Sequence, residues 1–403
     1  MENMDTMPQP ILAGAKIIVI GVGGGGSNAV NRMMDAQVKS ASFIAVNTDL
    51  QALRMSTAPV RLQIGAKLTQ GKGAGADPTV GQRAADESKL AIREKIKDCD
   101  MVFVTAGMGG GTGTGAAPVI AALAKEMGKL TVAVVTKPFS FEGRVKMDHA
   151  EIGIANLRKV VDTLVVIPNE KLLKIAGSMT YADAFRYADD VLRQEIQGIS
   201  DVIMNPSIIN LDFADICTVM RGKGVAHMGI GRGKGEGKTV EAVKQAVYNP
   251  LLETSIEGAT SVILHVMVGA DVKLDEVNEA ADLVRQVVAP GAHIIFGSDI
   301  RKSMQDEIII TVIATGFETP ENEIRVVPNQ QIPQQGQHGN QPAAATASPA
   351  KKIGVFGEEL KPAPVPEAKP PVPPPHGFTS SRVTVDDDFP EFLKKLNQRK
   401  DNQ

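Results

Sequence analysis

The chain has 403 residues, of which 43% are hydrophobic and 22% charged, and its formal net charge is −3. This length favours two or three domains, and the near-neutral charge gives no electrostatic case for binding nucleic acid or anionic lipid. Only two cysteines occur, Cys99 and Cys217, the six histidines lack ligand spacing, and no apolar run reaches 18 residues. We therefore expect a cytosolic protein without a disulfide framework, a zinc site or a membrane span.

The first expected strand, 16–21, runs into a glycine loop. Residues 21–28 read Gly-Val-Gly-Gly-Gly-Gly-Ser-Asn, and a helix is expected over 29–34. The spacing nearly matches the dinucleotide-binding fingerprint, with Asp49 after the next strand, 42–46, in place of the ribose-binding carboxylate. Taken alone, this segment favours a nicotinamide- or flavin-dependent oxidoreductase.

A second glycine loop follows an apolar strand pattern at 101–105. Residues 107–115 read Gly-Met-Gly-Gly-Gly-Thr-Gly-Thr-Gly, and an alanine-rich helix is expected over 116–127. Backbone N–H groups of such a loop converge on an anion, and glycine permits a close approach that a Cβ would block. Two such loops on neighbouring strands can enclose one polyphosphate, which a dinucleotide site does not require.

Strand and helix patterns keep alternating through the first half of the chain. Further strands are expected at 60–64, 130–135 and 163–167, and a helix at 79–96. This order predicts an α/β, Rossmann-like parallel sheet with helices on both faces and both glycine loops at the carboxyl edge. The run 233–239 resembles a Walker A loop but lacks one residue, and we interpret it as a solvated turn.

Polar residues after two later strands are candidates for a ribose and base site. Glu142 can accept hydrogen bonds from ribose hydroxyls, and Arg144 or Lys146 can face phosphate; the alternative is a solvated helix start. Asn169 is either a ligand contact or part of a helix cap.

A long helix is expected over 181–204, with apolar residues at spacings of three and four. Near its start, Phe185 and the pair Asp189 and Asp190 suit a guanine pocket, because guanine N1–H and the 2-amino group both donate to a carboxylate. The alternative is that Phe185 belongs to the core and both aspartates are solvated.

A polar cluster, Asn210, Asp212 and Asp215, lies at the start of the next expected helix. A helix start favours carboxylates, so capping explains one aspartate easily. It explains the three residues together less well, and such a cluster can orient a water molecule and support a metal.

The rest of the chain divides into a second folded region and a polar tail. Strands at 224–231, 261–268, 293–297 and 307–314, with helices at 240–248 and 274–287, predict a smaller α/β domain. After about 317, Gln, Pro, Ala and Lys dominate, a composition that cannot bury a core, and the chain ends in a short amphipathic patch. The expected segments are a disordered lead (1–13), a GTP-binding domain (14–180), a central helix (181–204), a C-terminal α/β domain (205–317), a disordered linker (318–383) and a partner-binding peptide (384–403).

Three short stretches of the chain resemble motifs of the FtsZ family of bacterial tubulin-like division proteins. Residues 107–115 resemble the tubulin/FtsZ signature loop, 210–215 the synergy loop and 386–393 the partner-binding tail. The resemblance implies a tubulin/FtsZ-like fold and a GTPase that polymerises head to tail, each subunit's synergy loop completing the site of the next. The competing hypotheses are an NAD(P)-dependent oxidoreductase using the Gly21 loop and a nucleotide-binding scaffold without turnover.

The resemblance, carried over residue by residue, implies three sets of site residues. The GTP-binding set is Gly24, Gly25, Gly26, Ser27, Asn28, Gly110, Gly111, Thr112, Gly113, Glu142, Lys146, Asn169, Phe185 and Asp189. The catalytic set is Asp212, Asp215 and Asn210, and the partner-binding set is Asp388, Phe389, Pro390, Phe392 and Leu393. Lys146 stands where the family usually has Arg, with Arg144 two residues earlier, and Asp189 is chosen over Asp190 by anchoring on Phe185.

The resemblance also implies ligands, partners and a location. GTP is the expected substrate, with Mg²⁺ held mainly by its phosphates. The expected partners are further copies of the chain and, through the terminal peptide, membrane-tethering and regulatory division proteins; neither nucleic acid nor direct membrane insertion is expected. The expected location is the cytoplasm, at the division site beneath the inner membrane.

Overall fold

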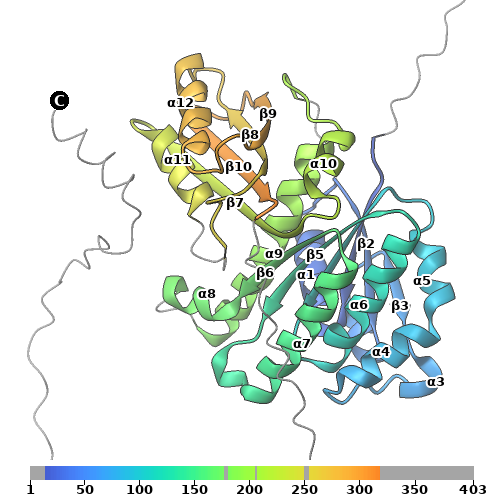
Figure 1. Cartoon of the computed structure of the whole chain (residues 1–403). Coiled ribbons are helices and arrows are strands. Elements are labelled where there is room, and N and C mark those ends of the chain that lie inside the picture. Colours follow the sequence, from blue (N-terminus) through green and yellow to red (C-terminus); the bar gives the residue numbers. More distant parts are fainter. Residues whose placement is uncertain (1–13, 177–179, 205–206, 249–253, 318–403) are drawn as a thin grey trace, which may run out of the picture. The chain divides into compact units, whose positions relative to one another are not determined.

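The computed structural model describes residues 14–317 except 177–179, 205–206 and 249–253 (Figure 1). The expected lead, linker and terminal peptide lie outside the described residues. The partner-binding set therefore stays a prediction, namely Asp388, Phe389, Pro390, Phe392 and Leu393.

Ten strands form one sheet in the order β3-β2-β1-β4-β5-β6-β7-β10-β8-β9. The first six are parallel: β1 (Ile17–Val22), β2 (Ser42–Asn47), β3 (Val60–Gln63), β4 (Met101–Gly107), β5 (Leu130–Lys137) and β6 (Thr163–Pro168). The others are β7 (Gly224–Lys234), β8 (Ser261–Val268), β9 (His293–Ile300) and β10 (Glu307–Thr315). β10 pairs antiparallel with β7 and β8, and only the start of β7 pairs with β6.

Each face of the parallel strands has its own helical cover, because successive strand residues point to opposite faces. Phe103 of β4 belongs to a core shared with one set of helices, whereas Val102 and Val104 belong to a core shared with the other. The first set is α1 (Gly23–Asp35), α2 (Leu50–Met55), α8 (Asn169–Ala176), α9 (Tyr181–Met204) and α10 (Phe213–Met220). The second set is α4 (Pro78–Glu87), α5 (Lys89–Ile96), α6 (Gly111–Glu126) and α7 (Arg144–Val160), and Figure 1 shows α4, α6 and α7 together in front of the strands.

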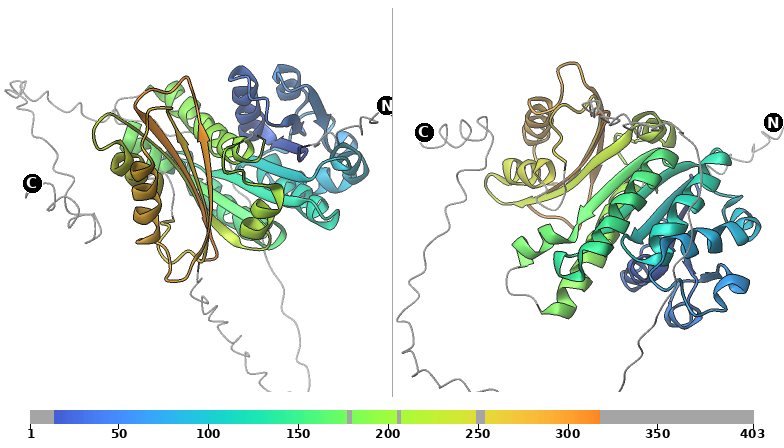
Figure 2. Two further views of the ribbon diagram at one scale, coloured as in Figure 1. Left: turned by 90° about the horizontal axis from the view of Figure 1, so that it is seen from above. Right: turned by 60° about the horizontal axis from the view of Figure 1, so that its bottom comes forward.

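The antiparallel strands are also packed between helices. α11 (Lys238–Val247) and α12 (Leu274–Arg285) lie on one side of them, as the left view of Figure 2 shows. α9 and α10 contact these strands as well. The remaining short helices are α3 (Ala66–Thr69) and the 3₁₀ turn η1 (Ser140–Glu142). No helix among the described residues is both long and apolar enough to span a bilayer.

The expected α/β fold class is confirmed, but several element boundaries differ from the sequence prediction. α1 begins at Gly23 and α6 at Gly111, so glycines of both loops form the first turn of a helix. The single helix expected over 79–96 is two helices that meet at Ser88. α7 begins where the sequence analysis left a helix start as the alternative, and its buried residues Ala150, Ile154 and Leu157 follow helical spacing.

The interpretation of 233–239 as a solvated turn was wrong for Lys238. Lys238 is only 7% exposed, and its ammonium forms ion pairs with Glu276 and Asp306, the latter at 3.0 Å. A buried ammonium requires such partners. Lys238 therefore ties α11 to the start of α12 and to the turn before β10, which is a structural role.

Candidate functional site

The two glycine loops lie side by side, because they follow the neighbouring parallel strands β1 and β4. A Cβ added to Gly23 would lie 2.8 Å from the backbone nitrogen of Gly113. A Cβ added to Gly25 would lie 3.0 Å from the backbone nitrogen of Gly107. The loops therefore pack backbone against backbone at the carboxyl edge of the sheet, as the sequence predicted.

Gly24 and Gly110 differ from the other glycines at this edge. Neither has a positive φ, and a Cβ on either would meet no atom within 4 Å. By contrast, a Cβ on Gly26 would lie 2.3 Å from the carbonyl oxygen of Thr105. Neither backbone conformation nor packing within the chain requires glycine at 24 and 110. What glycine provides there is open space over the N-termini of α1 and α6, whose free N–H groups and dipoles favour an anion.

A third segment of this edge was missed by the sequence analysis. Residues 71–76 contain four positive φ angles, at Gly71, Gly73, Gly75 and Ala76. The segment packs on the second glycine loop, because a Cβ on Gly111 would lie 2.8 Å from Ala74 Cβ. The alternating glycines after β3 were the available signal, and the run was too short to stand out from an ordinary turn.

Asp49, the residue expected to bind ribose in an oxidoreductase, has another role. Its Oδ1 accepts hydrogen bonds from the backbone N–H groups of Gln51 at 2.8 Å and Ala52 at 3.3 Å. The carboxylate therefore caps α2. This use removes the main residue that favoured a dinucleotide site.

Lys146, rather than Arg144, lies beside the second glycine loop. A Cβ on Gly109 would be 2.7 Å from the Lys146 carbonyl oxygen. Lys146 Nζ lies 2.9 Å from Glu142 Oε2, and Glu142 Oε1 accepts from the Phe139 N–H at 3.0 Å. The Arg144 side chain is 93% exposed. The pair of Glu142 and Lys146 thus links the glycine loop to the segment after β5.

That segment leads to an aromatic cluster at the start of α9. The Phe185 ring lies 5.1 Å from Phe139 and 5.0 Å from Tyr181, measured between centroids, and Phe141 joins the group. Nearby at the end of β6, Asn169 is 5% exposed and its Oδ1 has no hydrogen-bond partner among the described residues. Because buried polar atoms are usually paired, this oxygen fits a ligand contact better than a helix cap.

The two adjacent aspartates of α9 have different surroundings. Asp190 accepts from Arg193 Nε at 2.6 Å and Gln194 Nε2 at 2.7 Å. Burial raises the pKa of Asp190, but these hydrogen bonds outweigh it and leave the pKa below its ordinary value. Burial raises the pKa of Asp189 to about 7, with the Arg32 guanidinium acting against the rise. Asp189 is therefore the carboxyl group that is not already committed to neighbours on α9.

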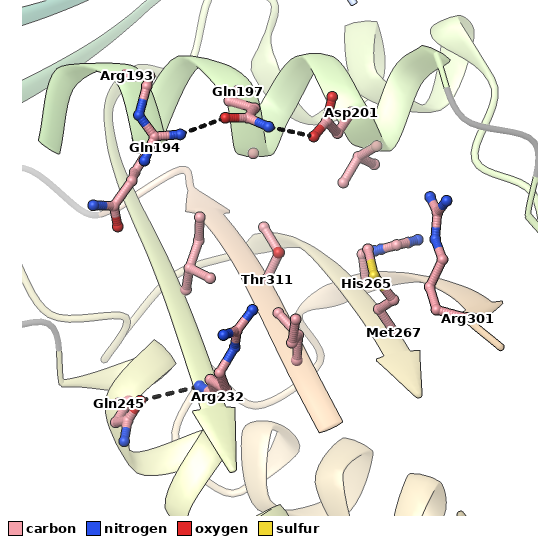
Figure 3. A pocket seen from close by; sticks show the side chains of 14 residues that line it. Arg193, Gln194, Gln197, Asp201, Arg232, Gln245, His265, Met267, Arg301 and Thr311 are labelled. Carbon is pink, nitrogen blue, oxygen red and sulfur yellow. Dashed lines mark hydrogen bonds between the residues drawn. The ribbon is translucent and has the colours of Figure 1, made fainter. Parts of the chain in front are cut away.

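The residues that bind Asp190 lie on the side of α9 that lines a cleft. Arg193 donates to Gln197, which donates to Asp201, along α9 (Figure 3). This side of α9 lines a cleft of about 510 Å³ whose other wall is formed by β7, β8 and β10. The side chain of Asp190 thus belongs to the network on the cleft side of the helix.

Two members of the expected catalytic set, Asp212 and Asp215, form a cap on α10. Asp212 Oδ1 accepts from the Asp215 N–H at 2.8 Å, and Asp215 Oδ2 accepts from the Asp212 N–H at 3.1 Å. Capping therefore accounts for one oxygen of each carboxylate. Asn210 and Asp212 are exposed, while Leu211 between them is buried. The preceding Ile209 pairs with β9, which fixes the loop that carries the cluster.

This cap and the glycine loops follow opposite ends of α9. Thr163, the first residue of β6, donates to the carbonyl of Met220, which places the end of α10 at the amino edge of the sheet. α9 runs between the two edges: Phe185 lies by the loop after β5, whereas Met204 lies by Gly14, just before β1. A helix of 24 residues is about 36 Å long. The structure does not bring the catalytic set to the GTP-binding set within one chain.

Among the described residues, no group of three or more His, Cys, Asp or Glu side chains is placed to hold a metal ion. The fold and the paired glycine loops define the class: a Rossmann-like α/β protein that binds a phosphorylated ligand at the carboxyl edge of its sheet.

Comparison with known proteins narrows this class. The Tubulin/FtsZ family, GTPase domain, matches residues 16–177, and the FtsZ family, C-terminal domain, matches residues 224–318. An empty FtsZ dimer from M. jannaschii is 44% identical, with a TM-score of 0.70 over 75% of this chain and 88% of that one. A CetZ2 protofilament structure from Haloferax volcanii is 18% identical, with a TM-score of 0.65 over 76% and 94% of the two chains, and shows the shared fold.

The chain belongs to the tubulin/FtsZ family, and it is a tubulin-like cytoskeletal GTPase. This assignment replaces the oxidoreductase and the scaffold without turnover that the sequence left open. The roles of individual site residues remain predictions, which the geometry above now makes specific.

Proposed function

We propose that the chain polymerises head to tail into the filaments of the division ring, and that it hydrolyses GTP at the interface between successive subunits. The observation that carries the proposal is the separation of the two candidate sets. The glycine loops lie at the carboxyl edge of the sheet, whereas Asp212 follows the far end of α9, whose last residue, Met204, lies by Gly14 before β1. A second copy stacked edge to edge brings these sets together. The related FtsZ from M. jannaschii, which forms a dimer, supports self-association.

GTP is proposed to lie across the carboxyl edge with its phosphates over both glycine loops. The phosphate contacts are Gly24, Gly25, Gly26, Ser27, Asn28, Gly110, Gly111, Thr112 and Gly113, with Lys146 as a nearby cation. Glu142 and Asn169 are placed for the ribose and base side, Phe185 for stacking and Asp189 for the guanine edge. Mg²⁺, held mainly by the phosphates, neutralises their charge when bound.

The amino edge has the properties of a protein contact surface. Ile208 is 66% exposed and Ile209 is 47% exposed, directly before Asn210 and Asp212. Exposed apolar side chains beside carboxylates fit an interface that buries the former and presents the latter. The oxygens of Asp212 and Asp215 that do not cap α10 then orient the water that attacks the terminal phosphate of the neighbour's GTP.

Substitution of Asp212 tests this arrangement. Phosphoryl transfer relies chiefly on positioning and charge neutralisation, so Asp212→Ala should leave GTP binding intact while turnover falls by roughly 100-fold or more. Asp212→Asn is the matched control, because asparagine caps a helix about as well as aspartate but carries no charge. An equal loss of turnover in both variants assigns the effect to the charge of the carboxylate rather than to the cap of α10.

A mixing experiment tests whether the carboxylate acts in trans. The Asp212→Ala protein is mixed with a Gly24→Leu protein. The second variant keeps Asp212, but its leucine fills the open space over the N-terminus of α1 where a phosphate is proposed to bind. Where the second variant stacks on GTP bound by the first, a complete site forms, and turnover of the mixture should exceed the sum of the separate variants. A strictly additive mixture, or normal turnover of Asp212→Ala alone, contradicts the shared site.

We further propose that the peptide 384–403 binds a membrane-tethering division protein and that the linker 318–383 acts as its tether. The apolar residues of the peptide, Phe389, Phe392 and Leu393, suit one face of a short helix in a partner's groove. Truncation after Phe317 should leave turnover and filament formation largely intact, yet abolish localisation to the division site. Phe392→Ala in the full chain is the matched point variant, and normal localisation of either protein contradicts the proposal.

A further inference from the structure

The loop that contains Asn210 and Asp212 is bonded to β9, the edge strand of the sheet. The Ile208 N–H donates to the Ser298 carbonyl at 2.9 Å, and the Ser298 N–H donates to the Ile209 carbonyl at 3.1 Å. These bonds belong to an isolated antiparallel bridge between Ile209 and Ser298. The bridge fixes the backbone up to Ile209, one residue before the proposed catalytic set begins.

Leu211 is the buried residue of this loop. It is 2% exposed, whereas Asn210 before it and Asp212 after it are exposed. Leu211 belongs to the core that also contains Ile216 of α10 and Ile263 of β8. Burial of a leucine side chain stabilises more than a solvent-exposed hydrogen bond does, so Leu211 decides which way its two polar neighbours face.

Gly297 of β9 provides the space that Leu211 fills. A Cβ at position 297 would lie 2.5 Å from Leu211 Cδ1 and 2.7 Å from Leu211 Cγ, much closer than carbon atoms pack. The ring of His265, which pairs with Gly297 across β8 and β9, would lie 3.1 Å from the same Cβ. Gly297 lies within a strand and has no positive φ, so its backbone does not require glycine. The packing of Leu211 is what requires it.

We propose that Leu211 and Gly297 are positioning residues for GTP hydrolysis: their contact holds the loop in the conformation that presents Asn210 and Asp212 to the neighbouring subunit. The inference rests on the proposed role of Asp212 in trans. Neither Leu211 nor Gly297 touches GTP, and each acts through the placement of the carboxylate. The cap between Asp212 and Asp215 orders the start of α10 internally, whereas the contact with Gly297 fixes where that start lies on β9.

Gly297→Ala in the full chain tests this contact. The added methyl group forces Leu211 to move by about 1 Å, since carbon atoms pack at about 3.5 Å rather than at 2.5 Å. A displacement of this size at a catalytic group is costly, so kcat for GTP should fall roughly tenfold or more, measured well above the critical concentration for assembly. The affinity for GDP should be unchanged, because the glycine loops and this loop follow opposite ends of α9.

Leu211→Ala completes a double-mutant cycle, because it removes the two atoms that the added methyl group would strike. If the contact positions the loop, Leu211→Ala alone also lowers kcat. Gly297→Ala then costs little more in that background, since the clash is gone, and the double variant has about the kcat of Leu211→Ala. Two losses that multiply overturn the proposal, because the methyl group then acts on another neighbour, such as His265.

A mixing experiment separates positioning from general damage to the fold. Gly297→Ala keeps its own glycine loops, and Gly24→Leu keeps a well-placed Asp212, so turnover of their mixture should exceed the sum of the separate variants. A mixture of Gly297→Ala with Asp212→Ala should show no gain, because neither protein then supplies a placed carboxylate. No gain in the first mixture, a gain in the second, or a lowered GDP affinity of Gly297→Ala overturns the proposal.

Asp212→Ala decides the proposed function separately. If Asp212→Ala retains normal turnover, the shared site is wrong, and the proposed positioning of its carboxylate is wrong with it. If Asp212→Ala loses turnover and regains it when mixed with Gly24→Leu, the shared site stands. Normal turnover of Gly297→Ala in that case overturns only the positioning role of Leu211 and Gly297.

Discussion

The two edges of the parallel sheet expose different chemical groups. The carboxyl edge, where the glycine loops lie, consists largely of backbone at the N-termini of α1 and α6, with open space at Gly24 and Gly110. The amino edge presents side chains, with exposed Ile208 and Ile209 beside Asp212. The first edge suits a small anion that must be approached closely, and the second suits a protein surface. If the proposed residue roles hold, the comparison teaches that neither edge alone carries both the phosphate-binding and the water-orienting groups.

The largest expected effect concerns the carboxyl edge. Gly24→Leu should weaken GTP binding by roughly 100-fold or more, because a branched side chain fills the space over the α1 N-terminus that a phosphate would occupy. Since no atom lies within 4 Å of a Cβ at this position, the fold should be unaffected. Gly24→Ala is the matched control and should raise the free energy of unfolding by about 0.5 kcal/mol through its helix propensity. Nucleotide titration and thermal unfolding measure both, and tight binding by Gly24→Leu would remove this loop from the site.

The next effect concerns the amino edge. Ile208→Asp should raise the critical concentration for GTP-dependent assembly by about tenfold, because a buried, unpaired charge opposes the contact. GTP affinity of the separate subunit should not change. Ile152→Asp is the control, since Ile152 is 61% exposed in the middle of α7, which covers one face of the parallel strands. Sedimentation against protein concentration gives the measurement, and equal behaviour of the two variants would contradict an interface at this edge.

A smaller effect separates the two aspartates of α9. Asp189→Ala should weaken GTP binding about tenfold and narrow the preference for GTP over ATP, because the purine then lacks its acceptor. Asp190→Ala should leave the preference unchanged, since that carboxylate is engaged by Arg193 and Gln194. Competition binding with both nucleotides measures the ratio. If only Asp190→Ala narrows the preference for GTP over ATP, then Asp190, and not Asp189, reads the guanine edge.

The smallest effect distinguishes the structural role of Asp212 from its proposed role in catalysis. Asp212→Ala should lower the free energy of unfolding by about 1 kcal/mol, because it removes the side chain that accepts from the Asp215 N–H. Asp212→Asn should lower it by much less. Denaturant unfolding of the two proteins gives the difference. If both unfold alike, the capping interaction contributes little, and the loss of turnover needs no correction for stability.

Local patterns in the sequence determined the main elements of the fold and the two glycine loops. The helix expected over 181–204 has the bounds of α9, and apolar runs placed β1 and β4 within one or two residues of their ends. These features follow from spacing along the chain: periodic apolar residues indicate which face is buried, and a run of glycines after an apolar segment indicates the loop that follows a strand. The sequence also placed both loops at one edge, because parallel strands align their carboxyl ends.

The tertiary structure decided everything that depends on which distant residues meet. It brought the backbone of Lys146 against Gly109 and the segment 71–76 onto Gly111, and it buried Lys238 between Glu276 and Asp306. It also placed Asp212 beyond the end of α9 that lies away from the glycine loops. Local spacing cannot carry this information, because burial and pairing depend on side chains tens of residues apart. Only the packed helices and strands determine whether a carboxylate caps a helix, balances a cation or stays free for a ligand.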